Sequence, residues 1–338
     1  MRGLRPTRRR LVVLIVVLVL GPIAVIGGGL AVGGTALALQ ARGTPSADAR
    51  SVRSDALWMG HAWVDGDRSQ ADVDALARRL DGTGIRDLCV HASPLQDDGT
   101  LPAALRPKAG WLVDALHRAI PGVRVHAWLG DVVAPDRLVL TDGATRRRVL
   151  AGARAVLADG FDGVHYDFEP VPDGNPGFLA LLEATGTLAH RQGRLLSVAA
   201  HQVEPLPGLR RPLELAVEPR WWSTRYLTRV AGLVDQIAIM SYDTAMPTGA
   251  AYTGYVRRQT EVALRAVPAG TGLLIGLPAY HQGTITHRGS ETVAAAIRGV
   301  RLGLGEGTPR PGFGVALYVD FTADETDWRD YRTGWVGP

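Results

Sequence analysis

Short apolar segments alternate with longer amphipathic segments from Ala56 to the C-terminus, and the alternation repeats about eight times. Short apolar runs bounded by turn-forming residues are typical of strands that are buried in a parallel sheet. The strands that this pattern predicts are Leu57–Val64, Ile85–His91, Val123–Leu129, Gly163–Glu169, Leu195–His201, Gln236–Tyr242, Leu273–Pro278 and Phe313–Asp320.

The segments between these strands have the apolar spacing of amphipathic helices. Strands that alternate with helices form a parallel sheet, and eight such units favour an α/β fold with a single closed (β/α)8 (TIM) barrel over an open doubly wound sheet. No GxGxxG motif follows the first strand. In such a barrel, active residues lie at the C-terminal ends of the strands. The predicted helices are Gln70–Leu80, Trp111–Ile120, Thr145–Ala158, Pro176–Arg191, Thr224–Val234, Val256–Ala266 and Glu291–Leu302.

The N-terminal segment has a different pattern. Five arginines lie in residues 1–10, and the run Leu11–Leu39 that follows contains no charged residue. About 20 apolar residues suffice to cross a bilayer, and arginines before such a run keep that end in the cytoplasm. We therefore expect a basic cytoplasmic flank at 1–10, a transmembrane anchor at 11–39 and a body outside the cytoplasm. A cleaved signal peptide is the alternative, with Ala36-Leu37-Ala38 as its cleavage site, and it would release a secreted protein.

Residues 40–54 are small and polar and have no apolar period, which predicts a flexible linker. The folded domain is then residues 55–338. The formal net charge of the chain is +4, but seven of its 37 basic residues and one of its 33 acidic residues lie in the first 50 positions. The body therefore lacks the clustered basic face that nucleic acid binding requires, and no nucleic acid partner is expected.

Two residue types occur once and exclude further classes. Lys108 is the only lysine, so the chain has no phosphate-binding GxxxxGK loop. It precedes a predicted helix rather than ending a strand, which argues against Schiff-base chemistry. Cys89 is the only cysteine, which excludes an intrachain disulfide and a cysteine-rich zinc site.

The predicted strand Gly163–Glu169 carries the candidate chemistry. Because side chains alternate along a strand, His165, Asp167 and Glu169 share one face, and the apolar residues between them share the other. Two carboxylates and an imidazole on the inner face of a barrel are costly, since each charge loses water and the carboxylates repel each other. We therefore interpret this face as functional. Asp167 would raise the proton affinity of Glu169, which could then act as a general acid.

The same segment carries a family resemblance. Asp162, His165, Asp167 and Glu169 resemble the DGxDxDxE signature of family 18 glycoside hydrolases, the chitinase-like barrels, with His165 in place of the middle aspartate. Three further segments are similar to patterns of that family: Met240–Asp243 (MSYD, for MxYD), Ser197–Ala199 and Gly276–Tyr280.

The resemblance implies a retaining, substrate-assisted mechanism on glycans that contain 2-acetamido sugars. Glu169 would protonate the glycosidic oxygen and later activate water. Asp167 would orient the acetamido group that attacks the anomeric carbon, while Tyr242 and Asp243 would hold that group in place. The resemblance implies no metal and no cofactor, and the expected partner is an N-acetylated carbohydrate.

Two departures from the family pattern bear on the substrate. His165 would pair with Asp167 if protonated, or make one hydrogen bond if neutral. Tyr318 stands on the eighth strand where the family usually has a tryptophan under the central sugar. The residues expected to contact the substrate are His165, Trp63, Trp128, His201, Tyr280, Tyr318 and Asp320.

Two other functions fit the same sequence. A non-catalytic surface protein could bind glycans on the same barrel, with proton transfer disabled by His165. A metal-dependent hydrolase or deacetylase could use histidines at strand ends, although the sequence has no HExxH motif. Those histidines are His61, His91, His126, His165, His201 and His281.

Overall fold

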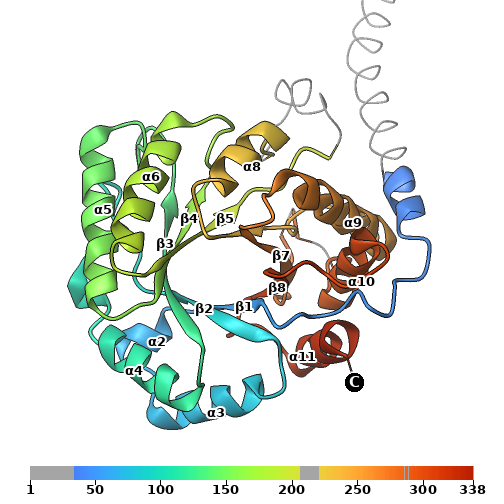
Figure 1. Ribbon diagram of the computed structural model, residues 1–338, viewed down its shortest axis with the longest axis horizontal. Helices are drawn as coiled ribbons and strands as arrows, with labels where there is room; N and C mark the ends of the chain where they lie inside the picture. The colour runs from blue at the N-terminus through green and yellow to red at the C-terminus, as the bar shows by residue number, and fades with distance from the viewer. Residues whose placement is uncertain (1–33, 206–220, 285, 288, 338) are drawn as a thin grey trace, which may run out of the picture.

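Eight parallel strands form a closed ring at the centre of the structure. The computed structural model describes residues 34–337 except 206–220, 285 and 288. Within these residues, the strands pair in chain order from β1 to β8, and β8 pairs with β1. Figure 1 shows this ring with the helices arranged around it. The predicted α/β class and the (β/α)8 barrel are therefore confirmed.

The strands lie close to their predicted positions, with the largest difference at β1. The first strand was expected to continue to Val64, but it ends at Met59. The strand ends before Gly60, which packs against the ring of Phe321 so closely that a Cβ at this position would come within 2.7 Å of that ring. The strands are β1 (Asp55–Met59), β2 (Ile85–His91), β3 (Arg124–Val132), β4 (Gly163–Glu169), β5 (Leu195–Ala200), β6 (Gln236–Ile239), β7 (Gly272–Pro278) and β8 (Phe313–Tyr318).

Each predicted helix is present in the described residues, and the structure adds α2 after β1 and α11 near the C-terminus. The helix predicted over Val256–Ala266 begins earlier, because the Thr248 hydroxyl accepts a hydrogen bond from the Ala251 N–H and caps a longer helix. The helices are α2 (Ala62–Asp65), α3 (Gln70–Leu80), α4 (Ala109–Ala119), α5 (Gly143–Ala158), α6 (Pro176–His190), α8 (Thr224–Ala231), α9 (Gly249–Ala266), α10 (Val293–Leu304) and α11 (Glu325–Tyr331).

The main apolar core lies between the strands and the surrounding helices. Val164, Tyr166 and Phe168, on the outer face of β4, are buried in it, as the alternation along the strand predicted. A second, smaller cluster fills the barrel interior and includes Trp58 and Met240. The outer faces of the strands therefore stabilise the barrel, and their inner faces are left to build a site.

The first part of the predicted linker 40–54, residues 40–49, lies against α9 and α10. The Arg257 guanidinium donates to the Gln40 carbonyl, and Arg298 donates to the carbonyls of Ala41 and Gly43. Arg301 donates to the carbonyls of Ser46, Ala49 and Gly334. The small polar composition suggested a mobile segment. The hydrogen bonds that hold it come from arginines about 250 positions later, which composition alone does not reveal.

The predicted flank at 1–10 and most of the predicted span at 11–39 lie outside the described residues. Residues 34–40 are helical and lie against α9, where Gly254 leaves room for the Leu37 carbonyl. Within the described ranges, no helix combines the length and the apolar character that a membrane crossing needs.

We predict that Arg301→Ala lowers the free energy of unfolding by roughly 2–3 kcal/mol, because three carbonyls lose a charged donor and part of that group is buried. Denaturant unfolding of the purified full chain measures the change. Arg265→Ala, which removes an exposed arginine of α9, is the control and should change the midpoint little. Equal midpoints for the two variants would contradict a docked segment.

Candidate active site

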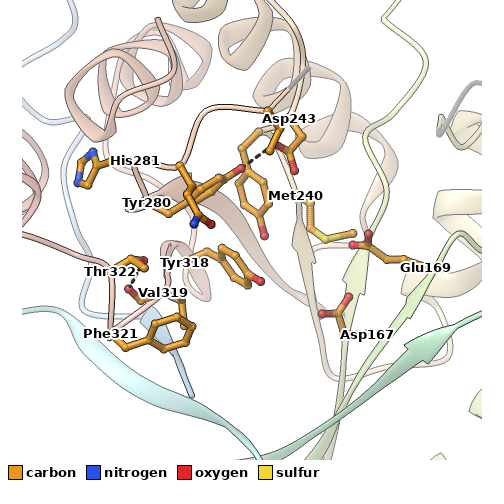
Figure 2. A pocket seen from close by; sticks show the side chains of 13 residues that line it. Asp167, Glu169, Met240, Asp243, Tyr280, His281, Tyr318, Val319, Phe321 and Thr322 are labelled. Carbon is orange, nitrogen blue, oxygen red and sulfur yellow. Dashed lines mark hydrogen bonds between the residues drawn. The ribbon is translucent and has the colours of Figure 1, made fainter. Parts of the chain in front are cut away.

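One cavity lies at the C-terminal ends of the barrel strands, where enzymes of this fold keep their active residues. Its volume is about 830 Å³, and its described lining comes from β4, β8 and the segments after β6 and β7. Figure 2 shows Asp167 and Glu169 on one side of the cavity and Tyr280 and Tyr318 across from them. The lining brings together six of the eleven predicted site residues: Asp167, Glu169, Tyr242, Asp243, Tyr280 and Tyr318.

The two carboxylates of β4 form a strongly interacting pair. Burial raises the pKa of Asp167 well above its usual value, and the charge of Glu169 raises it further, while the Trp128 N–H opposes the rise. That N–H makes no well-formed hydrogen bond, since Trp128 Nε1 and Asp167 Oδ1 are both buried without a partner among the described residues. Burial and the charge of the neighbouring carboxylate therefore favour the protonated form of Asp167. The pair is suited to hold a proton for transfer to a ligand.

His165 lies beneath this pair and outside the cavity lining. Its Nε2 accepts a hydrogen bond of 3.1 Å from the Trp58 indole, which can only donate. In the neutral ring Nδ1 then carries the proton and donates to Ser197 Oγ at 2.9 Å. Burial, with a smaller effect of nearby His126, lowers the pKa of His165 to about 3. His165 is therefore neutral, and both of its nitrogens are occupied.

The hydrogen bonds continue from Ser197 to the base of the barrel. Ser197 Oγ donates to Gln236 Oε1 at 3.2 Å, and Gln236 Nε2 donates to Asp87 Oδ2 at 3.0 Å. Asp87 also accepts from His126 at 2.8 Å and from Arg124 at 2.6 Å. Burial alone would raise the pKa of Asp87, but these two partners lower it to about 2. An ionised carboxylate at the base thus fixes the direction of every hydrogen bond up to Trp58.

Three tyrosines form the wall opposite the carboxylates. The Tyr318 ring stacks on the Tyr242 ring with centroids 5.3 Å apart, and it meets Tyr280, Trp58 and Trp128 edge-on. Burial is the largest cause that raises the pKa of each tyrosine, to about 12 for Tyr318. The phenols therefore stay protonated and can donate hydrogen bonds to a ligand, and their rings offer an apolar surface.

Asp243 has a backbone conformation that side chains rarely adopt. Its φ of 56° lies in the left-handed region, as does that of Ala245. Asp243 Oδ1 accepts a hydrogen bond of 2.9 Å from the Tyr280 hydroxyl, which Figure 2 marks with a dashed line. This bond joins the segment after β6 to the segment after β7 at the edge of the cavity.

Four other predicted site residues lie beside the main cavity. His201 lines an adjoining recess of about 40 Å³ together with Glu169, and its Nε2 accepts from the Val171 N–H at 2.9 Å. Trp128 lies next to Asp167 and Tyr318. The Trp63 indole donates to Asp320 Oδ2 at 2.7 Å, and Asp320 Oδ1 accepts from the Gly60 N–H. The Trp63 and Asp320 side chains join the segment after β1, which includes α2, to the loop after β8, and neither belongs to the lining of the cavity.

The sequence analysis did not predict several residues of this lining: Met240, His281, Gln282, Thr284, Val319, Phe321 and Thr322. It named His281 only as a possible metal ligand. Most of them follow β6, β7 and β8 directly, so their position at strand ends was the only available signal. Phe321 is 63% exposed, which is unusual for an aromatic ring and suits a surface that meets a ligand.

The histidines at strand ends do not gather into one metal site within the described parts of the chain. Two groups of three donor residues there could hold a cation, Asp243 with His287 and Glu291, and His281 with Asp324 and Asp327, and each contains one histidine. Among the six histidines at strand ends, His126 and His165 belong to the internal network, and His61 bonds to the His91 carbonyl. This distribution gives little support to a hydrolase with several histidine ligands.

Comparisons with solved structures place the fold among glycosidases. A family GH18 chitinase from Cycas revoluta matches with a TM-score of 0.58 and 15% identity over 83% of this chain and 99% of that chain. The family 18 N-acetylglucosaminidase from Paenibacillus barengoltzii gives 0.55 and 13% identity over 83% and 99%. The spore cortex-lytic enzyme SleL from Bacillus megaterium gives 0.57 and 13% identity over 83% and 73%.

Sequence comparison adds nothing to this, because no protein-family model and no curated protein sequence matches the chain. At such low identities the structural likeness shows a common fold. The chain therefore shares the (β/α)8 fold of family 18 chitinases and of spore cortex-lytic enzymes.

Proposed function

We propose that the chain is a retaining glycoside hydrolase that cleaves glycans containing 2-acetamido sugars, with Glu169 as the general acid and base. One observation carries the proposal. The carboxylates of β4 and the Tyr242-Asp243 segment after β6, which are far apart in the sequence, line the same cavity at the C-terminal end of the barrel. The fold that the chain shares with family 18 glycosidases supports the same assignment.

In the first step, the proton of the carboxylate pair goes to the glycosidic oxygen through Glu169. The carbonyl oxygen of the substrate's acetamido group forms a bond to C1 as the bond from C1 to the leaving oxygen breaks. Asp167 accepts a hydrogen bond from the acetamido N–H and stabilises the positive charge of the cyclic oxazolinium ion that forms. The Tyr242 hydroxyl donates a hydrogen bond to the acetamido group, and Asp243 fixes the orientation of that group.

In the second step, water attacks C1, the bond from C1 to the acetamido oxygen breaks, and Glu169 takes the proton of the water. The recess between Glu169 and His201, at about 40 Å³, is large enough for one water molecule. Since C1 is inverted twice, the product keeps the configuration of the substrate. We expect the sugar rings to contact Tyr318 and Tyr280, which line the cavity, and Trp128, which packs edge-on against Tyr318.

We further propose that the run Leu11–Leu39 anchors the chain in a membrane, with the barrel outside the cytoplasm. The arginines before the run and the absence of charge within it support this topology. The described end of the run, residues 34–39, lies against α9, so an anchored barrel would stand close to the bilayer. A glycan of the cell envelope is then the substrate within reach.

We predict that Glu169→Gln lowers kcat roughly 10²–10⁴-fold, because the amide cannot donate the acidic proton, while the KM for acetamido oligosaccharides changes little. Product release from a panel of acetamido oligosaccharides, followed by NMR of the anomeric protons, measures rate and configuration together. Glu183→Gln, an exposed glutamate of α6, is the control.

The wild-type product should first appear in the configuration of the substrate, and oligosaccharides without acetamido groups should stay intact. Inversion in the first product would contradict the substrate-assisted mechanism. If the wild type binds the panel and releases no reducing end, the non-catalytic glycan-binding function is correct instead.

We predict that the full chain stays in the membrane pellet after a carbonate wash, whereas a chain that lacks residues 1–33 is recovered in the supernatant. Protease added outside intact spheroplasts should digest the barrel. A mature protein that begins at Leu39 and is found in the medium would show that the segment is a cleaved signal peptide.

A further inference from the structure

Glu291 is a buried carboxylate that the proposed mechanism does not use. It lies between the segment after β7 and the start of α10, and its side chain is fully buried outside the cavity lining. Burial raises its pKa, and its hydrogen bonds oppose the rise. Burial of a charged carboxylate is costly unless several hydrogen-bond donors reach it, so the donors around Glu291 indicate what it does.

The donors are Asp243, the last residue of the MSYD motif, and Thr244, which follows it. Glu291 Oε2 accepts from the Asp243 N–H at 2.8 Å, and Oε1 accepts from the Thr244 N–H at 2.8 Å and from the Thr244 hydroxyl at 2.6 Å. Successive backbone N–H groups that point to one side form a concave site for an anion. Glu291 fills that site from a different loop.

These hydrogen bonds hold a turn whose backbone conformation is unfavourable. Asp243 and Ala245 both have a φ of 56°, in the left-handed region that non-glycine residues rarely adopt. Such a turn persists only when its surroundings hold it. Glu291 holds the backbone of Asp243, and the Tyr280 hydroxyl holds its side chain.

His287 completes the arrangement. Its Nδ1 lies 3.4 Å from Glu291 Oε2 and 3.9 Å from Asp243 Oδ1, and its ring lies against Tyr280 with centroids 4.1 Å apart. These three donor residues are close enough to hold a cation. However, both oxygens of Glu291 already accept hydrogen bonds from the turn, which favours a structural clamp over a metal ligand.

We propose that Glu291 is a positioning residue that holds Asp243 in the orientation needed to fix the acetamido group. The inference rests on the proposed function, since it gives a role to Asp243 in that reaction. Because Glu291 and Tyr280 belong to the segment after β7, the clamp also makes the two loops move as one body. Tyr280 already occupies Asp243 Oδ1, so the other oxygen is the one presented to the ligand.

The test compares Glu291→Gln and Glu291→Ala with a control one residue away, in the full chain. Thr292→Ala removes the cap of α10, where the hydroxyl accepts from Ala295 N, and leaves the Asp243 turn untouched. We expect Glu291→Gln to lower kcat about 10–100-fold with KM within about threefold of wild type, because an amide NH2 cannot accept the N–H donors. Thr292→Ala should lower Tm and leave kcat within about twofold.

A second measurement separates positioning from loss of stability. A thiazoline analogue of the cyclised acetamido sugar resembles the product of the first step, so its Kd should rise by about the same factor as kcat falls. Thr244→Val, which removes one of the three donors, should give a smaller change in the same direction. If Glu291→Ala does not fold, Glu291→Gln and Thr244→Val carry the test.

The outcomes distinguish this inference from the proposed function. A wild type that cleaves the panel while Glu291→Gln keeps its kcat and its thiazoline affinity overturns the positioning role alone. Losses in kcat that follow the losses in Tm across all the variants, with Thr292→Ala losing kcat in proportion to its Tm, also overturn it. A wild type that cleaves no acetamido glycan overturns the proposed function and this role with it.

Discussion

A closed barrel has a single interior, and every polar side chain that enters it must find its partner there. The chain from Trp58 through His165, Ser197 and Gln236 to Asp87 satisfies this requirement with hydrogen bonds that run in one direction. The two ends of the chain set this direction, because the indole can only donate a hydrogen bond and the ionised carboxylate can only accept one. His165, just below the carboxylates of β4, is therefore neutral and held in one orientation.

Two aspartates of the same interior show how environment decides function. Asp87 has Arg124 and His126 as partners, which lower its pKa to about 2, so it is ionised and structural. Asp167 lies next to another carboxylate, and the described lining of its cavity contains no arginine or lysine. Burial and the charge of Glu169 therefore favour its protonated form. Carboxyl groups whose surroundings separate their pKa values in this way are the usual basis for acid and base chemistry.

Features that depend on the local spacing of apolar and polar residues could be predicted from the sequence. Alternation along β4 placed Asp167 and Glu169 on the inner face, and strand-helix alternation predicted the barrel. Contacts between distant positions were beyond it: Trp58 and His165 are 107 positions apart, and Trp63 and Asp320 are 257 apart. Both tryptophans donate to partners that only the closed ring brings near. For the same reason, Glu291 looked like the first residue of a helix, and residues 40–54 looked like a linker.

The histidine at position 165 affects which side chains can exchange a proton with Asp167. An aspartate there could exchange a proton with Asp167. His165 cannot, because Trp58 occupies one nitrogen, Ser197 the other, and its pKa of about 3 keeps it neutral. With His165 excluded, Asp167 and Glu169 are the residues of the inner face of β4 that can share a proton. In the proposed mechanism, a substrate N–H group that donates a hydrogen bond to Asp167 would favour transfer of the proton to Glu169, so substrate binding itself would generate the general acid.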